Sequence, residues 1–343
     1  ALPNMDGAVQ VFINNLIQYY LRYRFISEDL LQNFVRDIKN EPFKMKAVIE
    51  LISITLEPDK IQVSPEILIR RPIREDLEKE YSLSPFYSDP NALGLHYPSA
   101  IMEIEIFGRS PIELQRFIEK AITILRLFGS GGIRYLRYNM SSDSILFPGV
   151  STVRPGETNL FLNSYTIYNK DVERFKKFWA ELSDVLNIGF GQEQFSRFQP
   201  YVFFSYQRYS EAILSGDIVE KRIVNTVSGL EGLYLNSSQE LRRYLTLNVS
   251  KIMGIFGFDA YKIRDEINDS YQIRSIFIHG NTVGYDSRKK FNKKHESLEK
   301  LFYFISNYLR ISIIILLGLK KEKDEFIDLL EDALIDKEKE RVL

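Results

Sequence analysis

Strand-forming patterns occur only in the first half of the chain. They are dense β-branched runs or alternations of apolar and polar residues, at 47–56, 60–69, 101–107, 133–140 and 158–167. Beyond residue 200, only the three- and four-residue spacing of amphipathic helices remains. The sequence therefore predicts an α+β protein, in which a mixed α/β domain (1–190) is followed by an all-α helical bundle (198–343).

The first domain is expected to contain strands flanked by helices. Apolar residues at helical spacing predict a helix over 8–24, and a second helix begins at Ser27. A third runs from Pro111 to Gly129, and a fourth covers 170–186.

Two features of the strands bear on pairing and chemistry. The runs 47–56 and 60–69 are separated by a turn signal and are expected to form a strand pair. The strand 101–107 places Glu103 and Glu105 on one face, either as an acid/base or metal pair or as the solvated face of the strand. No nucleophile and base are recognisable in this half, so we expect it to bind an unknown ligand or protein.

The segment 187–200 is rich in Gly, Gln and Ser and ends in Pro, which favours a joint between the domains. Ser237 and Glu240 form a capping-box pattern at the start of a helix, and Gly318 is expected to close another. The helices expected beyond the joint cover 201–214, 218–235, 237–253, 259–278, 298–317 and 325–335.

Composition narrows the possible chemistry. The chain has 343 residues, a net charge of -1 and no cysteine, so nucleic-acid affinity would have to come from a local basic patch. The absence of cysteine excludes disulfides, thiolate zinc sites and cysteine nucleophiles. No secretory signal is recognisable in the first ten residues, and we expect a cytoplasmic protein.

The segment 301–319 is apolar enough to imitate a membrane span. Asn307 and Arg310 lie in its middle, and a central Arg costs about 2.5 to 3.5 kcal/mol on insertion. We therefore expect no membrane contact, and a helix buried among other helices or in a subunit interface.

The stretch YQIRSIFIHGN, residues 271–281, places Arg274 five residues before His279. Guanidinium binds phosphate, and imidazole both takes and gives a proton near neutral pH. Gly280 permits the left-handed conformation that ends a helix. The alternative is structural: Arg274 bridges to a helix carboxylate and His279 caps carbonyl groups.

The order of three segments resembles the HEPN superfamily and, within it, the ApeA-like HEPN domains. The segments are VSGLEGLYL (227–235), SSQELRRYLTLNVSKIMG (237–254) and YKIRDEINDSYQIRSIFIHG (261–280), and the resemblance covers roughly residues 200–320. It implies a metal-independent endoribonuclease without a cofactor, commonly a homodimer through the helical domain, in stress response or antiviral defence.

The resemblance also implies roles for individual residues. His279 would be the general acid/base and Arg274 would stabilise charge on the phosphate, with Glu231 holding Arg274 in its orientation. Tyr271 and Asn281 would hydrogen-bond the scissile region. Ser275 stands where many active members carry Asn, Asp or His. The alternative function is a non-catalytic RNA- or nucleotide-binding and dimerisation module.

Helical geometry complicates the pairing of Arg274 with His279. Residues five apart on an α-helix differ in direction by about 140°, so the two side chains do not share a face. A cleft between two subunits relaxes this demand, because the Arg of one copy can act with the His of the other.

A basic run follows the motif and is expected to be an RNA-binding loop beside the cleft, with Tyr285 and Phe291 available for base stacking. The alternative is a solvated surface loop. His96 and His295 have no partner at ligand spacing and are assigned no site, and no metal site is expected. The basic residues are Arg288, Lys289, Lys290, Lys293 and Lys294.

Overall fold

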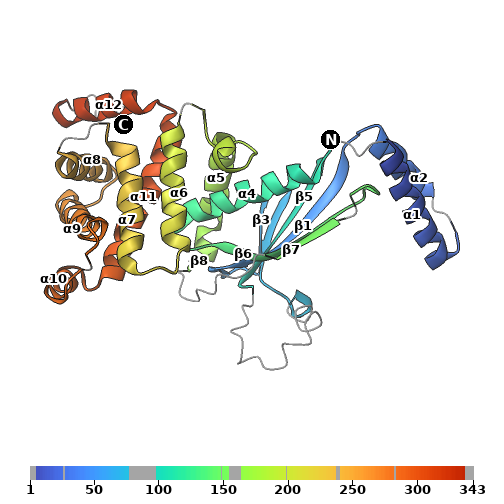
Figure 1. Ribbon diagram of the computed structural model, residues 1–343, viewed down its shortest axis with the longest axis horizontal. Helices are drawn as coiled ribbons and strands as arrows, with labels where there is room; N and C mark the ends of the chain where they lie inside the picture. The colour runs from blue at the N-terminus through green and yellow to red at the C-terminus, as the bar shows by residue number, and fades with distance from the viewer. Residues whose placement is uncertain are drawn as a thin grey trace. The chain divides into compact units, whose positions relative to one another are not determined.

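The computed structural model divides the chain into two compact units (Figure 1). The sheet unit comprises Ala1–Ala121, Arg134–Gly156 and Thr166–Ala180, and the helical unit comprises Ile122–Ile133, Glu157–Tyr165 and Glu181–Leu343. The predicted α+β class, with a sheet-rich first region and a helical second region, is confirmed. The segment 187–200, expected as a joint, lies within the helical unit. The residues described are 5–25, 28–76, 98–147, 149–153, 164–197, 199–236, 240–281 and 283–336.

The larger sheet of the sheet unit is antiparallel and has the strand order β3-β4-β5-β1-β6-β7. Along β1, side chains alternate between a buried apolar face and a more polar face, as expected of a strand packed on one side. A second sheet pairs β2 (Ile54–Leu56) with β8 (Tyr165–Ile167). The strands of the larger sheet are β1 (Phe43–Ile52), β3 (Lys60–Ser64), β4 (Ile67–Arg70), β5 (Ala100–Gly108), β6 (Arg134–Ser142) and β7 (Gly149–Val153).

The predicted pairing of 47–56 with 60–69 is wrong. β1 pairs with β5 and β6, while the second run folds on itself as the β3–β4 hairpin, with Pro65 in its turn. Proline has no backbone N–H for a strand ladder, so a turn there is favoured over a continuous strand. Ser53, with φ of 65°, breaks the first run into β1 and β2. Of the strand expected at 158–167, residues 158–163 lie outside the described part of the chain.

Glu103 and Glu105 lie on one face of β5, as predicted, and both are paired with basic side chains. The Arg70 Nε lies 2.6 Å from Glu103 Oε1, and the Lys46 Nζ lies 2.8 Å from Glu105 Oε2. Lys44 also pairs with Glu105, and hydrogen bonds from the two lysines hold the pKa of Glu105 below its ordinary value. These carboxylates therefore form part of an ion-paired strand face.

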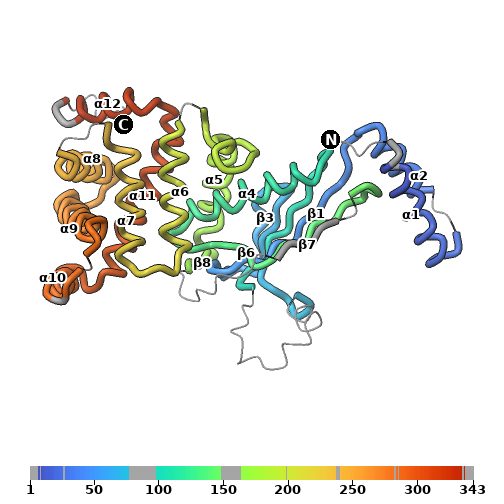
Figure 2. The backbone as a smooth tube through the Cα atoms, in the orientation of Figure 1, coloured from blue at the N-terminus to red at the C-terminus, as the bar shows by residue number. Residues whose placement is uncertain are grey.

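Two helices at the start of the chain form a hairpin, α1 (Met5–Tyr23) and α2 (Glu28–Ile38) (Figure 2). The rings of Phe12 and Phe34 stack with their centroids 3.9 Å apart, which places the contact near the middle of both helices. The sheet unit also contains η1 (Asn169–Asp171), and α4 (Pro111–Phe128) and α5 (Val172–Val185) each divide between the two units.

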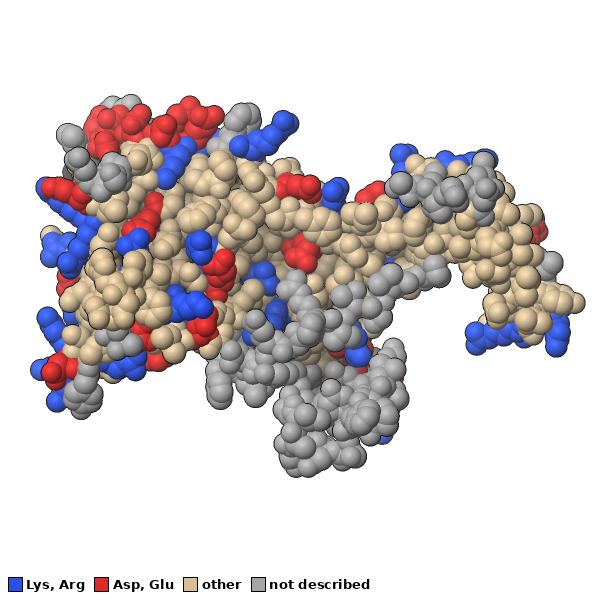
Figure 3. All heavy atoms as spheres, in the orientation of Figure 1, with Lys and Arg blue, Asp and Glu red and all other residues tan. Residues whose placement is uncertain are grey.

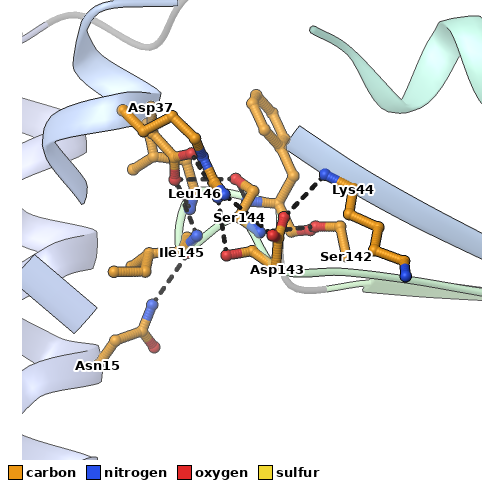
Figure 4. Close-up of polar contacts among 10 residues, drawn as sticks. Asn15, Asp37, Lys44, Ser142, Asp143, Ser144, Ile145 and Leu146 are labelled. Atoms are coloured by element: carbon orange, nitrogen blue, oxygen red, sulfur yellow. Dashed lines mark hydrogen bonds and ion pairs between the residues drawn. The ribbon is translucent and has the colours of Figure 1, made fainter. Parts of the chain in front are cut away.

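Asp37 of α2 holds the turn that follows β6 (Figure 4). Its buried carboxylate oxygen Oδ2 accepts hydrogen bonds from the Ser144 hydroxyl at 2.9 Å and from the backbone N–H groups of Ile145 and Leu146 at 2.8 and 3.3 Å. The Asn15 side chain of α1 donates to the Ile145 carbonyl at 3.1 Å. One side of the hairpin is thereby fastened to the rest of the sheet unit.

The helical unit is built around α11 (Leu298–Leu319), which packs against α6, α7 and α9. In Figure 1, α6, α7 and α11 run side by side. Its other elements are η2 (Gly191–Gln194), α6 (Pro200–Leu214), α7 (Val219–Tyr234), α8 (Leu241–Ile255), α9 (Ala260–Ile278), α10 (Tyr285–His295) and α12 (Lys323–Ile335).

Two expected helix boundaries differ from the structure. α11 continues through Gly318 to Leu319 and is followed by Lys320, whose φ of 53° is left-handed, so the prediction of a close at Gly318 is wrong. Of the capping box predicted for α8, Ser237 lies outside the described residues, and Glu240 precedes the helix with φ of 49°.

α11 has the length and composition of a membrane span, the only such helix in the described parts of the chain. About half of that span, 56%, is buried inside the protein, and seven residues from Leu301 to Leu317 have no more than 1% exposure. The prediction of a helix buried among other helices is confirmed.

The central Arg310 of this helix caps the end of α4. Its Nη1 donates to the carbonyl groups of Leu127 and Phe128 at 2.5 and 3.0 Å, and its Nη2 donates to the Asn307 side chain at 2.7 Å. The last carbonyl groups of a helix have no intrahelical donor and carry the negative end of the dipole. A basic residue inside an apolar helix is thus explained by a structural partner.

Replacing Arg310 with Met is expected to lower the free energy of unfolding by about 1 to 3 kcal/mol, because buried helix-terminal carbonyl groups lose their donor. Urea unfolding followed by circular dichroism measures the difference. Arg264→Met, which removes the same charge from an exposed position of α9, is the control and should be nearly neutral. Equal stability of the two variants would contradict this role of Arg310.

Candidate functional site

The candidate site is carried by the second half of α9. The helix begins at Asp259, whose side chain accepts hydrogen bonds from the backbone N–H groups of Tyr261 and Lys262 at 2.9 and 3.1 Å. Side chains at three- and four-residue spacing then form one buried stripe, which holds the helix on the bundle. They are Ile263, Ile267, Ser270 and Ile273.

The helix ends as the sequence predicts. Gly280 adopts φ of 76°, and its N–H donates to the Phe277 carbonyl at 3.0 Å. The N–H of Asn281 donates to the Ile276 carbonyl at 3.1 Å, which completes a Schellman motif. His279 is the last residue before this turn, so its side chain stands at the C-terminal end of α9.

Arg274 contacts Glu231 and Tyr271. Its Nη2 lies 2.9 Å from Glu231 Oε2 on α7, and its guanidinium carbon lies 5.4 Å from the centre of the Tyr271 ring, one turn earlier on α9. Arg274 follows Ile273 at the edge of the buried stripe, so its side chain is directed toward α7, which packs on α9. The predicted contact between Glu231 and Arg274 is present.

This ion pair is largely removed from water. The side chains of Arg274 and Glu231 are only 22% and 15% exposed. Burial raises the pKa of Glu231 above its ordinary value, although the charge of Arg274 and its hydrogen bond act in the opposite direction. Among described residues, Arg274 Nε and Glu231 Oε1 are buried without a hydrogen-bond partner. Unsatisfied buried polar atoms cost free energy, so two apolar side chains at these positions would stabilise the fold more than the ion pair does.

His279 lies apart from this pair. Its side chain is exposed, and it makes no side-chain hydrogen bond or ion pair within the described part of the chain. Its backbone N–H donates to the carbonyl of the half-buried Ser275 at 3.3 Å. Asn281 is also exposed. One copy of the chain therefore brings Arg274, Glu231 and Tyr271 together, and leaves His279 and Asn281 open to solvent.

The basic run after the motif is a helix, and the prediction of a loop is wrong. α10 covers Tyr285–His295, and Phe291, expected to stack on bases, is buried at 3% exposure. The Tyr285 side chain lies outside what the structure describes. Lys and Arg are good helix formers, and Phe291 supplies the apolar contact that anchors a short helix.

Ion pairs divide the basic residues of α10 into two groups. Arg288 pairs with the buried Glu220 of α7, and the Lys294 Nζ lies 2.8 Å from Asp269 Oδ2 and 3.4 Å from Asp265 Oδ2 on α9. The remaining three side chains are exposed, and no ion pair is described for them. They are Lys289, Lys290 and Lys293.

A polar cluster beneath α10 was missed by the sequence analysis, which assigned His295 no site. His295, at 8% exposure, lies with its Nε2 2.7 Å from Asp269 Oδ2. Burial acts to raise the pKa of Asp269, but hydrogen bonds from His295 and Lys294 outweigh it and hold that pKa below its ordinary value. The cluster continues through Glu266, whose carboxylate accepts from the Tyr308 hydroxyl at 2.6 Å.

This cluster fastens α10 to α9 and α11. Glu266 and Asp269 are three residues apart, a spacing that places both on one face of α9. That spacing was visible in the sequence, but the partners at residues 294, 295 and 308 come from other helices. His96 lies outside the described residues. No group of three His, Asp or Glu side chains suited to a metal ion occurs among the residues that the structure describes.

Comparison of the chain with protein families, with curated proteins and with solved structures finds no match. The site is therefore interpreted from its own residues: a largely buried Glu–Arg pair, an exposed imidazole at the end of the same helix, and three exposed lysines on the next helix that have no ion pair among the described residues.

Glu231→Gln is expected to change the pH dependence of stability. Because burial raises the pKa of Glu231 in the folded protein, its contribution is fully present below its ordinary pKa of 4.5 and is lost as pH rises through the folded value. The free energy of unfolding of the wild type minus that of the variant should therefore fall as the pH rises above about 4.5. Urea unfolding at several pH values measures it, and a difference that grows with pH would contradict the expectation.

Proposed function

We propose that the chain is a metal-independent endoribonuclease of the HEPN type, in which Arg274 and His279 act on an RNA phosphate. The proposal rests on the resemblance of residues 200–320 and on one contact, the 2.9 Å ion pair between Arg274 and Glu231. A buried guanidinium held by a carboxylate has a fixed direction, and preorganised charge is what stabilises a transition state most effectively. Defence against viruses or response to stress is the corresponding cellular role.

His279 supplies the complementary chemistry in this proposal. Its exposed imidazole at the end of α9 is free of competing side-chain partners among described residues, as a group that exchanges protons with a substrate requires. The imidazole takes the proton of the ribose 2'-hydroxyl as the 2'-oxygen bonds to phosphorus. The bond from phosphorus to the 5'-oxygen breaks, and that oxygen receives a proton. The products are a 2',3'-cyclic phosphate and a 5'-hydroxyl.

A second copy of the chain completes the site. Arg274 is directed toward α7, and His279 lies about 140° further around the helix at its exposed end. The two side chains of one copy are thereby turned apart, which favours a homodimer of the helical unit in which the Arg of one copy faces the His of the other. An isologous interface forms two equivalent sites of this kind.

The basic face of α10 binds the RNA backbone in this account. Lys289, Lys290 and Lys293 occupy neighbouring positions on one side of a helix that is anchored from its other side. Like charges four residues apart weaken a helix, so an external anion is their natural partner. Phosphate contacts of this type carry no sequence preference.

A second candidate function is RNA or nucleotide binding without cleavage. The observation that favours it is the same ion pair, because the Glu231 carboxylate cancels the charge that Arg274 would offer to a phosphate. Ser275, which stands where many active HEPN members carry Asn, Asp or His, also favours this second function.

Cleavage of labelled single-stranded RNA in the presence of EDTA separates the two functions. His279→Ala and Arg274→Ala are each expected to lower the rate by about 10² to 10⁴-fold, because each removes one role in the transition state. Arg264→Ala, an exposed arginine of the same helix, is the matched control and should cleave at the wild-type rate.

The substrate provides a further control. An RNA with a single 2'-deoxyribose at the cleaved position should remain intact there, because the attacking oxygen is missing. Cleavage of that substrate, or equal activity of His279→Ala and the wild type, would contradict the ribonuclease proposal. Binding by the wild type without any cleavage would support the second function.

Removal of the three unpaired lysines of α10 should weaken RNA binding and its salt dependence together. With Lys289, Lys290 and Lys293 replaced by Gln, the slope of log K against log salt should decrease by about 2, since each phosphate contact contributes about 0.7 on single strands. Fluorescence anisotropy between 50 and 300 mM salt measures it, with the exposed Lys39, Lys60 and Lys170 replaced by Gln as the control. An unchanged slope would exclude α10 from the RNA interface.

A further inference from the structure

The α1–α2 hairpin concentrates exposed apolar side chains. Between Val9 and Ile38 lie 11 of the 26 large hydrophobic residues that are exposed in the described chain, although this stretch is less than a tenth of its length. Two continuous stripes account for eight of them. On α1 they are Val9, Ile13, Ile17, Tyr20 and Leu21, and on α2 they are Leu31, Val35 and Ile38.

Both stripes lie on the same side of the hairpin. Phe12 and Phe34 mark the contact between the helices, and each is followed at once by a stripe residue, Ile13 or Val35. One residue turns the helix by about 100°, and antiparallel helices seen from one end wind in opposite senses. A step of one residue from the contact Phe on each helix therefore turns both stripes toward the same face of the hairpin.

The opposite side of the hairpin is already occupied. Asn15 and Asp37 each follow the contact Phe by three residues, a step of about 300° that turns them away from the stripes. Both hold the turn after β6, as the hydrogen bonds in Figure 4 show. The hairpin thus has one fastened face and one exposed apolar face, defined by the eight stripe residues above.

The exposed apolar face is large and its eight side chains are uncharged, although Glu28, the first residue of α2, lies in line with Leu31 and Val35. Its eight side chains, each 38% to 54% exposed, present roughly 600 Å² of apolar surface, against about 800 Å² contributed by one partner to a standard interface. Residues 7–21 contain no charged side chain, and in Figure 3 the visible side of the hairpin is mostly uncharged, with Lys and Arg near its ends.

We propose that this face binds the same face of a second copy of the chain, so that two hairpins form a four-helix bundle. The simplest way to bury the apolar face of a two-helix layer is to pack it against the same face of a second copy, related by a two-fold axis. None of the eight side chains is charged, and Glu28 lies at the end of its stripe, so self-pairing brings no like charges together at the centre of the face. A membrane surface is disfavoured, since interfacial helices carry Lys and Arg along the polar side, whereas α1 carries Asn14 and Gln18 there.

The mass of the full chain in solution tests this pairing. Light scattering is expected to show that Ile13→Glu combined with Val35→Glu lowers the mass by a factor of at least two. Gln18→Glu combined with Asn33→Asp adds the same charge to at least partly exposed positions outside the apolar face and should leave the mass unchanged. Circular dichroism of both variants should match the wild type, because every replaced side chain is at least partly exposed.

A single cysteine gives an independent readout, because the chain has none of its own. Under mild oxidation at low protein concentration, Ile17→Cys should form a disulfide-linked dimer faster than Gln18→Cys, its neighbour outside the face. Equal masses of the two double variants together with equal cross-linking would overturn the proposal. So would binding of the wild type, but not of the Ile13→Glu and Val35→Glu variant, to phosphatidylcholine vesicles.

Discussion

Burial of α11 is the constraint on which the helical unit depends. This helix is apolar enough to cross a membrane, so it must be surrounded, and α6, α7 and α9 cover it. Its one central cation, Arg310, is accommodated by the terminal carbonyl groups of α4. Because α7 and α9 both pack on α11 and on each other, Glu231 of one helix reaches Arg274 of the other. The core therefore fixes the direction of the guanidinium.

Features that depend on neighbouring residues could be predicted from the sequence, whereas most features that depend on residues far apart in the chain could not. The end of α9 at Gly280 and the Glu231–Arg274 contact were predicted, the first from local turn chemistry and the second from the HEPN resemblance. The strands that pair with β1 were not predicted, because strand pairing depends on segments far apart in the chain. The sequence predicts a loop for the basic run because the residues that anchor this helix, Glu220 and Asp269, lie on other helices.

The polar groups of the helical unit fall into two kinds. Arg310, Arg288 and His295 have partners that account for them structurally. The Glu231–Arg274 pair leaves two buried polar atoms without a hydrogen-bond partner, which stability alone does not favour, and His279 is exposed with no side-chain partner among described residues. Such departures from good packing are expected where a protein binds or reacts. The ribonuclease proposal assigns them one purpose, an RNA phosphate held between two copies of the chain.

The most direct test of this account is the activity of mixed dimers of Arg274→Ala and His279→Ala chains. If each site takes Arg from one copy and His from the other, random pairing yields half mixed dimers with one intact site each, and about one quarter of the wild-type cleavage rate returns. Each variant alone should cleave about 10² to 10⁴-fold more slowly than the wild type. Mixed dimers as inactive as the separate variants would contradict a site shared between two copies.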